Sequence, residues 1–228
     1  MHALLRHLAI VGFEGSPRIV EPEFDSQGRE LLTFIEGEIA HPNPWTDEAV
    51  ADLGRMLRQL HDATASFRAP ENALWQNWFI REVGQPDIIG HCDVAPWNVV
   101  FRGGKPVGLI DWEFAGQVDR LTEVAMAAWH SAQLYDDDVA AKNDVPSAMT
   151  RLYQARIFSD AYGLSLTERH RLSYRMLEFA LQSAANDVIE ARITPESQHV
   201  SGLWGIAWRT RSAAWLMRNR PALEAALM

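Results

Sequence analysis

Apolar residues recur at three- and four-residue spacing through most of the second half of the chain, a pattern typical of amphipathic helices. The segments with this spacing lie near residues 121–135, 145–162, 166–192 and 196–217. Ser165-Leu166-Thr167-Glu168 has the form of a capping box, and Thr194-Pro195 is a helix-start signal. The pattern therefore predicts helix alone after Glu113.

The first half of the chain mixes short helices with short strands. A helix is expected over residues 1–11, ended by Gly12 in a left-handed cap, and a second helix begins after Thr46, a good N-cap. Short strands are expected at 18–20, 30–35 and 87–90. The glycine-rich turn Arg102-Gly103-Gly104-Lys105-Pro106 joins 99–101 to 107–110 as a hairpin. The fold class expected is α+β, with a small head on a mainly helical body.

Composition and charge exclude several classes of protein. The 228 residues, 47% of them hydrophobic, are enough for one large domain or two small lobes with a proper core. A formal net charge of −9 argues against a nucleic-acid partner. The single cysteine, Cys92, excludes an intrachain disulfide and a cysteine-rich zinc site. No apolar run is long enough for a membrane span, and the opening residues do not form a signal peptide, so a cytoplasmic location is expected.

Three polar side chains flank the predicted hairpin. Asp93 and Asn98 lie on the loop that leads into its first strand, and Asp111 follows its second strand. Because the outer ends of an antiparallel hairpin lie together, Asn98 and Asp111 are expected within a few ångströms of each other. A carboxylate and an amide oxygen suit Mg²⁺. Asp93 can face the same space and take a proton from an acceptor hydroxyl, as phosphoryl transfer requires.

Each of these residues also has a purely structural interpretation. Asp and Asn in loops usually form turns through local backbone hydrogen bonds. The joint pattern is more specific: His91 and Asp93 on one loop, Asn98 before a hairpin, and Asp111-Trp112-Glu113 after it.

This pattern resembles the catalytic and metal loops of the aminoglycoside phosphotransferase and choline kinase-like family. His91-Cys92-Asp93-Val94-Ala95-Pro96-Trp97-Asn98 and Ile110-Asp111-Trp112-Glu113 carry the resemblance. Protein kinases share the spacing, but their metal-binding aspartate is followed by Phe-Gly. Phe34-Ile35-Glu36-Gly37 is similar to the hinge of the family, and Leu57-Arg58-Gln59-Leu60-His61 to the helix that follows it.

The resemblance implies a role for each matching residue. Asp93 would be the catalytic base, Asn98 and Asp111 the Mg²⁺ ligands, and Glu113 a second metal ligand or a supporting group. The backbone of the hinge residues Phe34, Ile35 and Glu36 would meet the adenine of ATP. His91 would orient the loop. Cys92 stands where the family usually has glycine, so a positive φ there would strain the backbone.

The implied fold is kinase-like. It has a remnant N-terminal lobe with the hinge at 1–37 and a helical C-terminal lobe at 38–228, with the catalytic and metal loops at 91–113. The front of the chain departs from the family, because about 33 residues are too few for five strands plus a helix. The only lysines are Lys105 and Lys142, so no lysine precedes the hinge to hold the phosphates. Gly12-Phe13-Glu14-Gly15 is better explained as a helix cap and turn than as a phosphate loop.

Two further features have both a structural and a functional interpretation. Trp204, Trp208 and Trp215 lie on one helix face, as a core stripe or as an aromatic wall for a flat or cationic acceptor. Asp136-Asp137-Asp138 is either a solvated helix end or, as the family resemblance implies, part of an acidic surface that recognises polyamine acceptors. The negative net charge favours a cationic acceptor.

These observations predict an ATP- and Mg²⁺-dependent phosphotransferase that modifies a hydroxyl of a small molecule, such as an aminoglycoside-like compound or an amino alcohol. The alternative is a non-catalytic pseudokinase or a fragment that binds a small ligand. A metal-dependent phosphohydrolase is a third hypothesis. The expected partners are a nucleotide and the acceptor, without a membrane. A second copy of the chain pairing at the open edge of the short head stays a further expectation.

Overall fold

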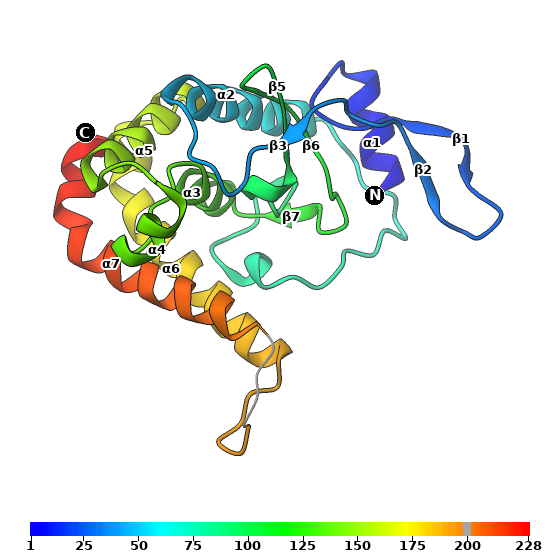
Figure 1. Ribbon diagram of the computed structural model, residues 1–228. Helices are drawn as coiled ribbons and strands as arrows, with labels where there is room; N and C mark the ends of the chain where they lie inside the picture. The colour runs from blue at the N-terminus through cyan, green and yellow to red at the C-terminus, as the bar shows by residue number, and fades with distance from the viewer. Residues whose placement is uncertain (198–201) are drawn as a thin grey trace.

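A helical body carries three small sheets along one flank in the computed structural model, which describes residues 1–197 and 202–228 (Figure 1). The helices are α1 (His2–Ile10), α2 (Asp47–Thr64), α3 (Arg120–Ser131), α4 (Asp137–Ala140), α5 (Ala148–Tyr162), α6 (Leu166–Glu190) and α7 (Leu203–Leu227). The strands are β1 (Ile19–Phe24), β2 (Glu30–Leu32), β3 (Glu38–Ile39), β4 (Ile88–Gly90), β5 (Val99–Arg102), β6 (Lys105–Leu109) and β7 (Gly116–Val118). The predicted α+β class with a mainly helical C-terminal part is confirmed.

Helix α2 contacts both the strands and the other helices, among them β4, β6 and α5. Thr46 caps it as predicted, its hydroxyl accepting the N–H of Ala49 at 3.2 Å. The apolar stripe that includes Leu53 and Leu57 is fully buried, and α2 packs closely on α5. A Cβ on Gly54 would lie 2.8 Å from the carbonyl oxygen of Phe158, so only glycine permits this approach.

Helices α6 and α7 run side by side along the edge of the body (Figure 1). The capping box of Ser165 and Glu168 is formed as predicted. Helix α7 begins at Leu203 instead of near 196, with 198–201 outside the described residues, and it continues through Pro221. Buried Leu223 and Leu227 hold its last turns against the core, which offsets the backbone hydrogen bond that proline cannot make. None of the helices in the described ranges is long and apolar enough for a membrane span.

The predicted hairpin is confirmed as β5 and β6, and β3 adds to its outer side to give the order β3-β5-β6. Gly103 and Gly104 both have positive φ, as a tight turn between twisted strands requires. The prediction of helix alone after Glu113 is wrong. Gly116–Val118 forms β7, which pairs antiparallel with β4. A strand of three residues is too short to have a period, and its pairing with β4 is a long-range interaction.

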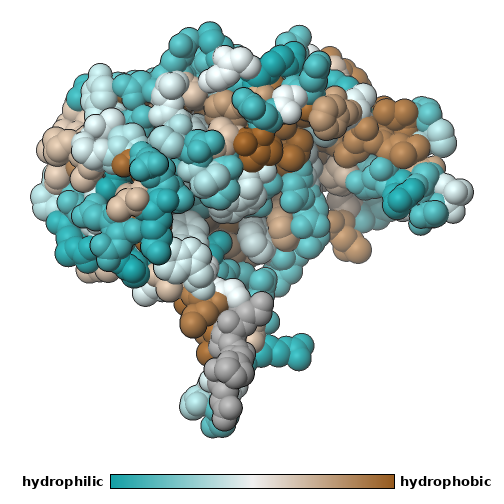
Figure 2. Space-filling view, viewed as in Figure 1, coloured by the Kyte–Doolittle hydropathy of each residue, from teal (hydrophilic) through white to brown (hydrophobic). Residues whose placement is uncertain are grey.

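The front end of the molecule consists of α1 and a two-stranded ribbon, β1 and β2, that extends away from the helical body (Figure 1). The predicted cap is present, because Gly12 follows α1 with a φ of 81°. Apolar side chains such as Val20 and Phe24, 40% and 48% exposed, reach the surface here (Figure 2). The division of the chain at residues 37 and 38 stays a prediction.

Candidate active site

The hairpin brings the predicted metal-site residues to one end of the sheet. Asn98 directly precedes β5 and Asp111 follows the residue after β6. Val99 is paired with Leu109, and the N–H of Ile110 donates to the carbonyl oxygen of Asn98 at 3.0 Å. The ladder therefore extends to the outer end of the hairpin, where Asp111 is one residue beyond the partner of Asn98. Asp111 has a φ of 63°, a left-handed backbone that the sequence pattern did not indicate.

Asp93 and Asn98 form a direct pair. The buried amide of Asn98 donates to the Asp93 carboxylate at 2.8 Å and to the Asp93 carbonyl oxygen at 3.0 Å. Both bonds use the amide nitrogen, so the side-chain oxygen of Asn98 is left as an acceptor. This arrangement fixes the orientation of Asp93 and presents an oxygen ligand beside it.

His91 is a fully buried residue that connects the loop to the hairpin. Its Nε2–H donates to the carbonyl oxygen of Ile110 at 2.9 Å, and its Nδ1 accepts the N–H of Asp93 at 3.3 Å. The Trp112 ring lies against it edge-on, 4.6 Å between ring centroids. Burial lowers the pKa of His91, which keeps the ring neutral. These contacts are those of an orienting residue.

A buried polar network holds the loop from below. Glu123, completely buried on α3, accepts the backbone N–H of Cys92 at 2.6 Å and bonds His61 of α2 at 2.8 Å. His61 in turn bonds the hydroxyl of Tyr162 at 2.7 Å. Burial raises the pKa of Glu123, but the hydrogen bonds from His61 and Cys92 outweigh it and leave the pKa below its usual value. Glu123 was missed at the level of sequence, although an acid inside an otherwise apolar helix is a signal.

Cys92 has the left-handed backbone that its position suggested, with a φ of 66°. It is completely buried, and burial raises the pKa of its thiol far above the usual range, so it is not a nucleophile. Cys92 is therefore a strained structural residue next to Asp93.

Asp93 has the chemistry of a general base. The pKa of its carboxyl group is raised to about 6, and burial is the largest cause. The carboxylates of Asp111 and Glu113 also act to raise this pKa. The hydrogen bond from Asn98 and the charge of Arg209 oppose the rise. Two of these charged groups, Asp111 and Glu113, line one cavity, and Arg209 lines another.

The first cavity, here called the hinge cleft, has a volume of about 830 Å³. Its walls include Phe34, Ile35 and Gly37 of the hinge segment on one side and Ile110, Asp111, Trp112 and Glu113 on the other. Phe34 is 86% exposed, while the carbonyl oxygen of Glu36 accepts from Arg102 at 3.2 Å and does not line the cleft. No lysine or arginine among the described residues lines this cleft.

The second cavity, here called the aromatic pocket, has a volume of about 480 Å³, and the sequence indicated part of its wall in Trp204 and Trp208. Its walls include Trp97, Tyr135, Trp204, Trp208, Lys142 and Arg209. The tryptophan stripe is divided between two roles, because Trp215 is buried in the core while Trp204 and Trp208 line this pocket. The helical spacing of the tryptophans indicated that they share a helix face, but it could not distinguish a tryptophan buried in the core from one that lines a pocket.

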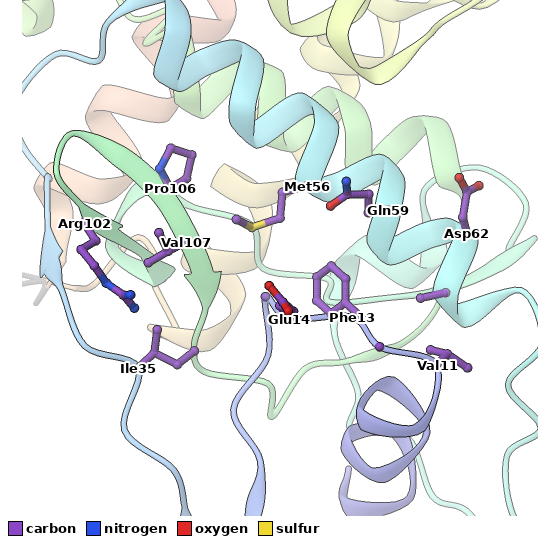
Figure 3. A pocket seen from close by; sticks show the side chains of 13 residues that line it. Val11, Phe13, Glu14, Ile35, Met56, Gln59, Asp62, Arg102, Pro106 and Val107 are labelled. Atoms are coloured by element: carbon purple, nitrogen blue, oxygen red, sulfur yellow. The ribbon is translucent and has the colours of Figure 1, made fainter.

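A third hollow of about 760 Å³ lies between the segment after α1, helix α2 and the hairpin (Figure 3). Phe13 lies below Met56 and Gln59 of α2 in this view and is nearly buried. The carbonyl oxygen of Gly15 accepts the N–H of Leu109 at 2.8 Å. The segment from Gly12 to Gly15 therefore packs as a helix cap and turn. One hinge residue, Ile35, lines both this hollow and the hinge cleft.

The donor set at the outer end of the hairpin, of which Asp111 lines the hinge cleft and Asn98 does not, fits a hard cation that brings ligands of its own. Within 1–197 and 202–228 no basic side chain forms an ion pair with Asp93, Asp111 or Glu113. No group of three or more His, Cys, Asp or Glu in the same ranges forms a complete metal cage. Mg²⁺ is usually held by one or two carboxylates, waters and substrate phosphates, which matches Asp111 and Asn98 better than a protein cage does.

Three similarities to known proteins agree with this geometry. Residues 65–153 match the model of the phosphotransferase enzyme family. The chain is 52% identical over 226 residues to the trifolitoxin immunity protein of Rhizobium leguminosarum bv. trifolii, covering 99% of this chain and 87% of that protein. A crystal structure of a choline/ethanolamine kinase family protein from Mesorhizobium loti matches with a TM-score of 0.59 at 17% identity, covering 99% of this chain and 82% of that one.

Proposed function

The chain belongs to the phosphotransferase enzyme family, and we propose that it transfers a phosphoryl group from Mg-ATP to a hydroxyl of a small molecule. The observation that carries the proposal is the Asp93–Asn98 pair at the end of the hairpin, beside the cleft that Asp111 and Glu113 line. This is an oriented carboxylate next to oxygen ligands for a metal, which is the arrangement that phosphoryl transfer needs.

Asp93 takes the proton of the acceptor hydroxyl in this mechanism. A carboxyl group with a pKa of about 6 is mostly ionised at neutral pH, yet it is more basic than an exposed aspartate. The amide of Asn98 holds the carboxylate in place, and His91 and Glu123 fix the backbone on either side of Cys92. The residues of the loop therefore orient the base before the acceptor arrives.

Asn98 and Asp111 would hold the Mg²⁺ of the nucleotide, with Glu113 as a further ligand or a support. Bound Mg-ATP supplies the phosphoryl group and the charge that neutralises the phosphate oxygens. Phe34 and Ile35 line the cleft where the adenine would lie, which supports the hinge assignment. The carbonyl oxygen of Glu36 is already bonded to Arg102, so Glu36 contributes less to this contact than the sequence indicated.

A second candidate function is binding without transfer. Its support is the hinge cleft itself, because no lysine or arginine among the described residues is available there to clamp the phosphates. The name of the relative adds a second support, since it ties that protein to immunity against trifolitoxin. An immunity protein can act by modifying a hydroxyl of a harmful molecule or by sequestering the molecule, and only the first needs the donor site.

Calorimetric titration of Mg-ATP into the chain and into Asp111→Ala tests the donor site. We expect binding that disappears in Asp111→Ala and is absent when EDTA replaces Mg²⁺. Glu82→Ala is the matched control, because Glu82 is exposed and lies outside the hinge cleft. This variant should bind like the unchanged chain.

Transfer is then measured as ADP formation with a panel of hydroxyl compounds. Acceptor-dependent ADP formation supports the phosphotransferase. Metal and nucleotide binding without turnover across a broad panel favours the binding function, and no binding at millimolar Mg-ATP contradicts the donor site altogether. Release of phosphate from phosphate esters without nucleotide would support a phosphohydrolase instead.

A further inference from the structure

The aromatic pocket borders the loop that carries Asp93, through Trp97. Trp97, which lines it, is four residues after Asp93 on the same loop, and Arg209, another wall residue, is close enough for its charge to act on the Asp93 carboxylate. The pocket thus adjoins the segment that follows Asp93, while Asp111 and Glu113 line the hinge cleft. The pocket is the natural acceptor site if the chain transfers phosphoryl groups.

The charges on the walls of the two cavities are opposite. Glu30, Glu38, Asp111 and Glu113 line the hinge cleft. In contrast, Lys142 and Arg209 line the aromatic pocket, and no aspartate or glutamate among the described residues does. A cation that entered the aromatic pocket would be repelled chiefly by Lys142, since Arg209 is already paired with Asp187 at 2.7 Å. The pocket therefore disfavours the cationic acceptor that the net charge suggested.

Lys142 and Arg209 each lie over the ring of a tryptophan that lines the pocket. The Lys142 ammonium lies 5.2 Å from the centroid of the Trp204 ring, and the Arg209 guanidinium 4.9 Å from that of Trp208. Trp208 is also stacked on Trp129, with 5.2 Å between the ring centroids. Indole faces capture ammonium groups, but here the chain supplies the ammonium and guanidinium groups itself.

The acidic run of α4 does not restore a negative surface near the pocket. Asp136 is bonded by Arg211 at 2.7 Å and by Arg218 at 3.1 Å. Asp137 bonds the buried side chain of Arg151 at 2.9 Å. The run is therefore neutralised by arginines, and it acts as a structural connection between α4, α5 and α7.

Arg209 is already partly bonded within the chain. One of its terminal nitrogens bonds Asp187 at 2.7 Å, whereas its buried Nε has no partner among the described residues. The Nε atom is closed off from the pocket, so it offers no contact to a ligand there. The pocket thus combines aromatic walls with the ammonium of Lys142 and a guanidinium that is paired with Asp187.

We propose that the aromatic pocket binds a flat, hydroxyl-bearing molecule with an anionic group, and that Lys142 and Arg209 select this anion over a cation of the same shape. The proposal rests on the proposed function only in naming this molecule the acceptor. The rings of Trp97 and Trp204 would contact the flat part, since Arg209 and Trp129 already cover the Trp208 ring, and the anion would lie near Lys142 and Arg209.

Three probes of one shape test the charge preference: phloretate, tyrosol and tyramine. They share a hydroxyphenyl ring and a two-carbon arm, which ends in a carboxylate, a hydroxyl or an ammonium group. Binding is followed by tryptophan fluorescence and calorimetry without nucleotide or Mg²⁺. We expect phloretate to bind at least about tenfold more tightly than tyramine, with tyrosol between them.

The lysine content provides a matched pair of variants, because Lys142 and Lys105 are the only lysines. Both side chains are exposed, and Lys105 is the first residue of β6, with Glu48 as its partner. Lys142→Gln should lower the preference for phloretate about threefold or more, whereas Lys105→Gln should leave it unchanged. Isotope-labelled methyl groups on the lysines should show a shifted Lys142 resonance with phloretate and an unshifted Lys105 resonance.

Tyramine binding as tightly as phloretate would overturn the proposal, and so would a failure of all three probes to bind at millimolar concentration. An equal effect of the two lysine variants would also contradict it. Because these measurements need no donor, a clear preference for phloretate in a chain that does not bind Mg-ATP would refute the phosphotransferase and leave the pocket assignment intact.

Discussion

The loops that carry the candidate site and the front end that faces them are held in different ways. The segment 88–118 is tied to two helices by buried bonds, among them those of Glu123 to Cys92 and to His61. The front end, residues 1–32, has one helix and a two-stranded ribbon, and apolar side chains of the ribbon such as Val20 and Phe24 remain partly exposed. Phe34, in the hinge, is 86% exposed.

This difference indicates how the work of the site is divided. Orientation of a base within a few tenths of an ångström needs neighbours that are themselves locked, and the loop has them. A nucleotide base needs a surface to lie against, which an exposed hinge can offer at little cost to stability. We therefore expect substitutions under the loop to change folding and those in the hinge to change affinity.

Removal of Glu123 should have the largest effect on stability. Glu123→Ala leaves the N–H of Cys92 and the ring of His61 without their buried partner, which should lower the free energy of unfolding by about 3–5 kcal/mol. Urea unfolding measures this, with Glu82→Ala expected within about 0.5 kcal/mol of the unchanged chain.

Gly90→Ala tests the position of the Glu123 carboxylate without removing it. A Cβ there would lie 1.9 Å from Oε2 of Glu123, so the carboxylate has to move. A Gly90→Ala variant as stable as the parent chain would contradict the claim that this network holds the loop rigidly.

Asp93→Asn should abolish most turnover while the fold and the donor site remain. Loss of a general base typically lowers the rate by about 100-fold or more. The metal ligands Asn98 and Asp111 are unchanged, so affinity for Mg-ATP should stay within a few-fold. Steady-state kinetics with the best acceptor and calorimetry with Mg-ATP measure the two effects. Unchanged turnover would exclude Asp93 as the base.

Glu168 should contribute a smaller amount that depends on pH. Burial raises the pKa of Glu168, but hydrogen bonds from Ser165 and Arg120 outweigh it and lower the pKa to about 2. Because the folded pKa is below the unfolded value, this stability is present above about pH 4.5 and is lost as the pH falls toward 2.

The test is Glu168→Gln, which should be less stable than the parent chain by about 1 kcal/mol at neutral pH, a figure reduced for the partial exposure of the group. The difference between the two should shrink as unfolding is measured at lower pH. A constant difference from pH 7 to 2 would assign the effect to packing instead.

The parts of the fold that the sequence predicted are those with local signals. The capping box at Ser165, the N-cap at Thr46 and the turn at Gly103-Gly104 each lie within a few residues, so their chemistry can be seen in the chain itself. The short strand β7 has no such signal, since its partner β4 lies 26 residues earlier, with Gly90 paired to Gly116.

The same distinction applies to the candidate site. Asp93, Asn98 and Asp111 were found because a hairpin fixes the relation of its own ends. The aromatic pocket joins Trp97 of the loop to Lys142 after α4 and Arg209 of α7, and no local pattern connects segments so far apart in sequence. The positive charge of the pocket is therefore visible only in the folded structure, where these segments lie together.

Phe34→Ala should have the smallest effect on stability and a measurable one on affinity. Its side chain is 86% exposed, so the free energy of unfolding should change by less than about 0.5 kcal/mol. Phe34 also lines the hinge cleft, so loss of its ring should weaken Mg-ATP binding about three- to tenfold if the adenine packs there.

Ile10→Ala is the matched control, because Ile10 is 84% exposed in the front end but lies outside the hinge cleft. It should change neither stability nor affinity. A loss of affinity in Phe34→Ala alone would assign the base contact to the hinge. Equal affinity in all three proteins would mean that the nucleotide is held by Asp111 and the metal alone, and that the hinge contributes only a cover.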